Sequence, residues 1–159
     1  RVVQLPGSRS SSIAGGIFLL YLSGSACAVM TGRMITRFGR EGVLPLAYAT
    51  MVTGALVSMA RPLPLAIAGM AILTIGFFVA HATASGWVTQ RGRQQRGHAT
   101  ALYLSSFYIG SSVVGGAAGL AWHGGRWNGV ASYIATLMTV ALLVALWLRR
   151  RAKAVRPFA

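Results

Sequence analysis

The sequence predicts an all-α fold: a polytopic membrane helix bundle with about five transmembrane helices. The chain is 55% hydrophobic and only 10% charged, whereas soluble domains average about 25% charged residues. It contains five apolar stretches, each close to the roughly 20 residues that a helix needs to cross a bilayer. Short linkers between them hold almost every charge. The stretches do not alternate in polarity, and backbone groups in lipid must bond internally, so we expect helices.

The predicted helices follow one another closely. They cover residues 12–31, 42–60, 65–90, 99–122 and 129–148, and a basic tail covers 149–159. Pro45 lies near the start of the second helix, where proline is tolerated. The third helix becomes polar in its last turns, and the fourth has the densest polar content. Because the linkers are short, neighbouring helices should be antiparallel, and successive linkers should lie on opposite sides of the membrane.

The net charge of +14 and the pI near 11.9 are typical of proteins that bind nucleic acid. The placement of the charges argues against that partner. Basic residues cluster at the ends of apolar runs, and no predicted helix has a basic face. We therefore expect a lipid bilayer as the partner and no nucleic acid.

Basic residues are concentrated in every second linker. One set of linkers, with the tail, holds eleven of the 15 Lys and Arg residues: Arg33, Arg37, Arg40, Arg91, Arg93, Arg96, Arg149, Arg150, Arg151, Lys153 and Arg156. The other set holds Arg1, Arg9, Arg61 and Arg126. An excess of Lys and Arg marks the cytoplasmic side. This predicts an external N-terminal end and a cytoplasmic C-terminus. Tryptophans near predicted helix ends fit interfacial anchors: Trp87, Trp122, Trp127 and Trp147.

The first basic linker carries a recognisable pattern. It reads Gly32-Arg33-Met34-Ile35-Thr36-Arg37-Phe38-Gly39-Arg40-Glu41. Gly39 permits a tight turn, and the arginines can bind helix C-terminal carbonyls and lipid phosphates. Glu41 is expected to pair locally with an Arg. The simpler interpretation is a positively charged cytoplasmic loop with no further role.

This linker resembles the signature loop of the major facilitator superfamily, G-x-x-x-D-R-x-G-R-[R/K]. Gly32, Arg37, Gly39 and Arg40 match. Thr36 replaces the usual Asp, and Glu41 replaces the final basic residue, which puts the family's cytoplasmic latch between halves in doubt here.

Further segments resemble bacterial facilitators of the arabinose-efflux-permease (YnfM-type) group: 76–81 followed by 85–87, and 101–104 followed by 108–112. The resemblance implies helices eight to twelve of a twelve-helix secondary transporter in a bacterial inner membrane. It also implies alternating access, efflux of a small-molecule substrate, no cofactor, and a missing N-terminal half as the partner. We accordingly expect this chain, which starts at Arg1, to be a fragment or an incomplete gene model.

Several polar residues are candidates for lining a transport cavity. His81 is the one histidine well inside a predicted membrane helix, and Ser85 shares its face. His81 can line a cavity and respond to protons, or it can simply bond to a neighbouring helix. Ser105, Tyr108 and Ser112 form one stripe, with Tyr103 nearby. Such a stripe lines a water-filled cavity or bonds across helices.

Small residues on the fourth helix predict close helix packing: Gly110, Gly115, Gly116 and Gly119. A segment that bends during alternating access is the alternative.

Other function classes find less support in the sequence. No Asp or Glu lies inside a predicted helix, so a carboxylate proton relay is not expected in this chain. There is no P-loop, and the single Cys27 excludes an internal disulfide or a cysteine-based zinc site. We expect no enzyme activity and no metal. An intramembrane serine hydrolase using Ser85 or Ser23 and Ser25, and a small structural or regulatory membrane subunit, are the alternatives.

Overall fold

A computed structural model describes residues 30–154 of the chain, with side chains described as far as Arg151. Every regular element in these residues is helical, which confirms the all-α prediction. A short helical segment covers 30–38, and the longer elements are α2 (Arg40–Val57), α3 (Leu63–Arg91) and α4 (Arg96–Ala154). Almost all of the predicted helix at 12–31, with Cys27, and the end of the tail lie outside the described residues.

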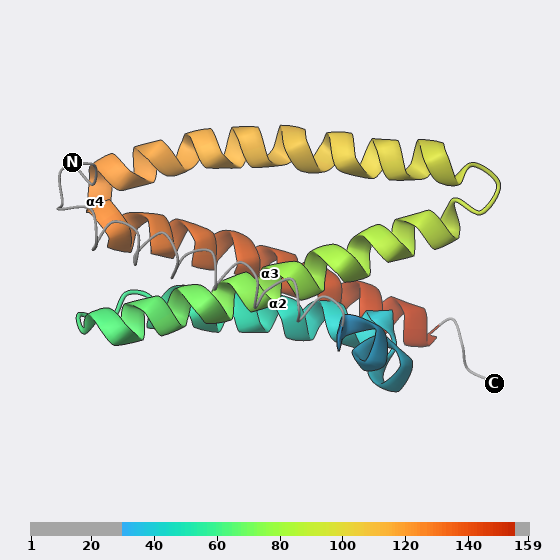
Figure 1. Ribbon diagram of the computed structural model, residues 1–159, viewed down its shortest axis with the longest axis horizontal. Helices are drawn as coiled ribbons and strands as arrows, with labels where there is room; N and C mark the ends of the chain where they lie inside the picture. The colour runs from blue at the N-terminus through green and yellow to red at the C-terminus, as the bar shows by residue number, and fades with distance from the viewer. Residues whose placement is uncertain (1–29, 155–159) are drawn as a thin grey trace, which may run out of the picture.

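Helix α4 consists of two antiparallel arms rather than one rod. Its backbone leaves helical geometry at Arg126, where φ is 50° and ψ is −133°, and the chain reverses there (Figure 1). The first arm covers 96–125 and the second arm covers 127–154. The break falls inside the 123–128 linker that separates the two predicted helices. Two glycines, Gly124 and Gly125, immediately precede it.

Two helices of the described residues are long and apolar enough to cross a membrane. They are α3 and the Arg96–Arg151 part of α4, and the latter contains both arms. Helix α2 does not meet the same standard, because its 18 residues include Arg40 and Glu41 and this charged pair lowers the mean hydropathy of so short a helix. Hydropathy in the described residues therefore supports α3 and the two arms of α4 as membrane-spanning segments. The predicted count of five transmembrane helices stays a prediction.

Helix α2 lies at the centre of the packing. It crosses α3 on one side and the second arm of α4 on another, and α3 meets α4 less extensively. Small side chains dominate the buried core, which contains Val43, Ala47, Met51, Val79 and Ala80. The helices can therefore approach closely, and lipid-embedded helix pairs gain most of their stability from such van der Waals contact.

The α2–α3 crossing depends on glycine at Gly54, Gly69 and Gly76. A Cβ added at Gly69 would lie 2.7 Å from the Gly54 carbonyl oxygen and 2.7 Å from the Ser58 Cα. A Cβ at Gly54 would lie 2.8 Å from the Gly69 oxygen. Backbone meets backbone at this point, so no side-chain movement relieves the clash. These glycines were not among the packing residues predicted from the sequence, although Gly54-x-x-x-Ser58 fits the small-x-x-x-small pattern.

The two ends of the bundle differ in charge. Residues 30–40, the turn between α3 and α4 and the C-terminal end of α4 lie at one end (right in Figure 1). Their sequences hold the described members of the larger basic group. The α2–α3 turn and the break at Arg126 lie at the other end, where the Trp127 indole N–H donates a 2.8 Å hydrogen bond to the Ser58 carbonyl. The fold thus gathers the alternate linkers at opposite ends, as their lengths predict.

Candidate functional site

A cavity of about 190 Å³ lies where α2, α3 and both arms of α4 meet. We call it the His81 cavity. It is lined by Tyr48, Met51, Phe77, Ala80, His81, Ala84, Tyr103, Phe107 and Met138. Each of α2, α3 and the two arms of α4 contributes at least one of these residues. Its wall is largely apolar with a few polar atoms, which is the usual character of a small-molecule site.

His81 and Tyr103 form the polar centre of this cavity. The Tyr103 hydroxyl lies 3.0 Å from the His81 Nδ1, and the tautomer of the imidazole decides which group donates. The same hydroxyl is 3.5 Å from the His81 carbonyl oxygen. The bond joins α3 to the first arm of α4. Of the candidate cavity residues, the structure therefore brings these two together.

Aromatic rings surround His81. The Phe77 ring is stacked on the imidazole at 5.8 Å between centroids, and the Phe107 ring is tilted against it at 4.8 Å. Phe77 was predicted only to pack, and Tyr48, Phe107 and Met138 were not predicted as site residues, yet all four line the cavity. The sequence does contain a signal for the two phenylalanines. Phe77 is four residues from His81 and Phe107 is four residues from Tyr103, and residues at this spacing share a helix face.

The other polar candidates lie away from this cavity. The Ser85 hydroxyl donates to the Ala82 carbonyl at 3.3 Å within α3. Ser105, Tyr108 and Ser112 are exposed on the first arm, and Tyr108 is 64% accessible. None of the three lines the cavity or bonds to another helix within residues 30–151. Whether they line a larger cavity stays a prediction.

The glycines predicted to pack on the first arm meet little in the described residues. A Cβ at Gly110, Gly115, Gly116 or Gly119 would find nothing within 4 Å there. Their surroundings are open as well, since Leu120 is 77% exposed and Val113 is 68% exposed. Close helix contact occurs instead at the α2–α3 crossing, and a packing role for the first-arm glycines stays a prediction.

The basic linker is helical where a loop was expected. Residues 30–38 form helix, Gly39 interrupts it, and α2 begins at Arg40. Gly39 adopts φ 68° and ψ 160°, a conformation available almost only to glycine. Its N–H still bonds to the Ile35 carbonyl at 2.9 Å. The expected loop is wrong because backbone hydrogen bonding continues on both sides of this single residue.

Within the linker, Arg40 makes the long-range contacts. Its guanidinium donates to the Gln90 side-chain oxygen and, at 3.5 Å, to the Gly86 carbonyl near the end of α3. Thr36 instead donates locally, to the Arg33 carbonyl at 2.8 Å. Arg37 lies over the Phe38 ring at 5.5 Å. A Cβ added at Gly32 would have no described atom within 4 Å.

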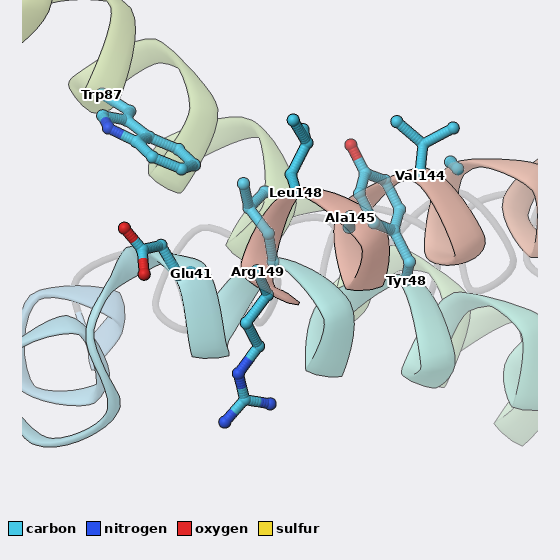
Figure 2. Close-up of a pocket in the computed structure, with 9 residues that line it drawn as sticks. Glu41, Tyr48, Trp87, Val144, Ala145, Leu148 and Arg149 are labelled. Atoms are coloured by element: carbon cyan, nitrogen blue, oxygen red, sulfur yellow. The ribbon is translucent and has the colours of Figure 1, made fainter. Parts of the chain in front are cut away.

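Glu41 lines a second hollow of about 240 Å³ at the basic end, together with Tyr48, Trp87, Val144, Leu148 and Arg149. Figure 2 shows the Arg149 guanidinium pointing away from the Glu41 carboxylate. Glu41 forms no ion pair with any residue of the described part, so the expected local pairing is not formed there. Two arginines at this end lie over tryptophan rings. The Arg91 guanidinium is 5.1 Å from the Trp87 ring centroid, and the Arg151 guanidinium is 4.6 Å from that of Trp147.

Metal ligation finds no support in the described residues. Within 30–151, no three His, Cys, Asp or Glu side chains are grouped so as to hold an ion. The polar chemistry of the His81 cavity is therefore that of an imidazole and two phenols among aromatic and aliphatic groups.

Nearly the whole chain is similar in sequence to proteins named as transporters. The uncharacterized MFS-type transporter YybF of Bacillus subtilis is 38% identical over 143 residues, which is 90% of this chain and 34% of the relative. The inner membrane transport protein YnfM of Escherichia coli K12 is 39% identical over 151 residues, or 95% of this chain and 36% of the relative. An uncharacterized transporter of Buchnera aphidicola (subsp. Schizaphis graminum) is 31% identical over 150 residues, or 94% and 36%.

This chain spans about a third of the length of the curated relatives that it matches. No family model matches it, and no solved structure matches it.

Proposed function

We infer that this chain, a homologue of MFS-type transporters, is part of a secondary transporter that moves a small molecule across a bacterial inner membrane by alternating access. The observation that carries the inference is the alignment of nearly the whole chain with proteins named as transporters. The apolar character of α3 and of both arms of α4 supports it. We propose that the described segments correspond to the later helices of the second half of a twelve-helix transporter.

The proposed orientation places the basic end of the bundle in the cytoplasm. Lys and Arg are enriched on that side of membrane proteins, and the arginines of the three segments at this end have no carboxylate partner in the described residues. Trp87 and Trp147, each under an arginine, fit residues at the membrane–water boundary. Efflux is the proposed direction, in keeping with the group that the sequence resembles.

An intramembrane serine hydrolase is disfavoured by the geometry. Such an enzyme needs a serine within hydrogen-bond reach of its histidine base. The His81 Nδ1 is paired with Tyr103, and the Ser85 hydroxyl is paired with a backbone carbonyl. A purely structural membrane subunit would not require the cavity that four segments build around His81, although it would share the helices.

A chimaera tests the proposed function. Residues 1–159 replace the matching part of the Escherichia coli relative, and the product is expressed in inverted membrane vesicles. We expect proton-gradient-driven accumulation of neutral amphipathic compounds inside vesicles that carry the chimaera. The chain alone should give none, because it spans about a third of its relatives and a facilitator cavity lies between two halves.

The comparison separates the function classes. Specific transport by residues 1–159 alone contradicts the account of an incomplete transporter. A chimaera that inserts normally and moves none of the compounds moved by the intact relative favours a structural or regulatory subunit.

A further inference from the structure

We propose that the His81 cavity binds a small, neutral, single-ring aromatic compound that carries a hydroxyl group, such as a phenol. As a substrate class, the proposal rests on the proposed function. As a binding site, it depends only on residues of this chain, because all of the described lining residues belong to α2, α3 and α4.

The size of the cavity sets the first limit. Its volume is about 190 Å³, and an engineered apolar cavity of about 150 Å³ in another protein admits benzene. One aromatic ring with a small substituent fits this space, whereas drug-sized molecules occupy pockets of about 300 Å³ or more.

The wall favours an aromatic ring. Phe77, Tyr103 and Phe107 present ring faces and edges around the imidazole, and aromatic pairs at such separations gain energy beyond the area that they bury. Met51 and Met138 line the cavity from α2 and the second arm. Flexible thioethers adapt to ring edges and interact favourably with them.

The hydrogen bonds specify the substituent. Tyr103 occupies the Nδ1 of His81, and the Nε2 makes no hydrogen bond with any described residue. Nε2 donates or accepts a hydrogen bond according to the tautomer, and a hydroxyl group can accept from it or donate to it. Tyr48 also lines the cavity, and its hydroxyl makes no hydrogen bond with any described residue. A bound ring without a polar group would leave Nε2 without a hydrogen bond.

The absence of permanently charged groups among the described lining residues disfavours ions. The lining named above contains no Lys, Arg, Asp or Glu, and a charge buried without a partner in a membrane protein is costly. Benzoate and anilinium should therefore bind far more weakly than a phenol of equal size. The hollow beside Glu41 differs in this respect, because Glu41 and Arg149 border it.

Nuclear magnetic resonance of ¹⁵N-histidine in the full 159-residue chain, held in phosphatidylcholine nanodiscs, tests the site. The probe is 4-methylphenol, and the reporter is the His81 Nε2 resonance, which is identified by its loss in His81→Phe. We expect a saturable shift with 4-methylphenol and none of comparable size with toluene or benzoate. His98 and His123, which lie outside the cavity, should not respond.

Matched variants show whether the shift comes from the cavity. Ala84→Leu fills the cavity from α3 and should weaken 4-methylphenol binding at least tenfold, while Ala82→Leu, on the same helix but outside the lining, should leave it unchanged. Met138→Phe fills the cavity from the second arm, so the test does not depend on one variant folding. A shift that rises linearly in all variants, as lipid partitioning produces, would overturn the proposal, and so would unchanged binding in both filled variants.

The binding test and the chimaera assay fail independently. Saturable binding without transport by the chimaera preserves this site and removes the proposed function. Transport by the chimaera without a saturable His81 shift removes this binding site and preserves the proposed function.

Discussion

Replacing Gly69 with alanine should destabilise the helix bundle by at least about 2 kcal/mol, as expected for overpacking against a fixed backbone. The added Cβ would lie 2.7 Å from the Gly54 oxygen and from the Ser58 Cα. Separating α2 from α3 is the only relief, and that separation weakens the contacts of Val43, Ala47 and Met51 in the core. Unfolding by sodium dodecyl sulfate in mixed micelles, followed by circular dichroism, measures the loss.

Gly115→Ala is the matched control for this substitution. It also replaces a mid-helix glycine, but its Cβ meets nothing within 4 Å in the described residues. Alanine is the better helix former by about 0.5–1 kcal/mol, so this variant should be neutral or slightly stabilised. Gly76→Ala should fall between the two, because its Cβ meets the movable Met51 Cγ at 2.7 Å as well as the Ala47 oxygen at 2.9 Å. Equal stability of the Gly69 and Gly115 variants would show that the crossing is not tight.

Replacing Arg40 with methionine should cost about 1.5–3 kcal/mol, the range for hydrogen bonds to a charged group. Arg40 joins the start of α2 to the end of α3 through Gln90 and the Gly86 carbonyl, and methionine keeps its apolar stem while removing both donors. The same unfolding measurement applies. Gln90→Leu should reproduce much of the loss.

Arg37→Met provides the comparison within the same linker. Arg37 is exposed and lies over the neighbouring Phe38 ring, a contact worth about 0.5–1 kcal/mol at an exposed site. If the Arg37 and Arg40 variants lose equal stability, the two arginines serve only as general positive charges, and the link to α3 has no special role.

Apolar segment length and linker charge predicted the features that depend on solvation. The helical class, the reversal within residues 123–128 and the gathering of basic linkers at one end all follow from two rules. Backbone polar groups in lipid must bond internally, and charged residues lie outside the lipid. His81 and Tyr103, which the sequence singled out as polar residues of apolar segments, lie together at one cavity in the structure. That they line a transport cavity stays a prediction.

Features that depend on which helix faces meet were less predictable. The glycines of the first arm and those of the α2–α3 crossing carry similar sequence signals, and only the three-dimensional arrangement separates them. The same difficulty applies to the stripe of Ser105, Tyr108 and Ser112. Its polarity does not reveal whether another helix packs on it or water reaches it. The linker around Gly39 was expected as a loop because its residues are charged, yet charged residues continue a helix without penalty where water reaches them.

The central claim is that the first arm of α4 crosses a membrane, with the basic turn before it in the cytoplasm. Single cysteines at Gln94 and His123, in a Cys27→Ala background, test this through labelling by a membrane-impermeant maleimide. The account predicts that Gln94→Cys is labelled only in inverted vesicles and that His123→Cys is labelled only in intact cells. Labelling of both sites from one side would contradict the crossing, and the reverse pattern would contradict the orientation.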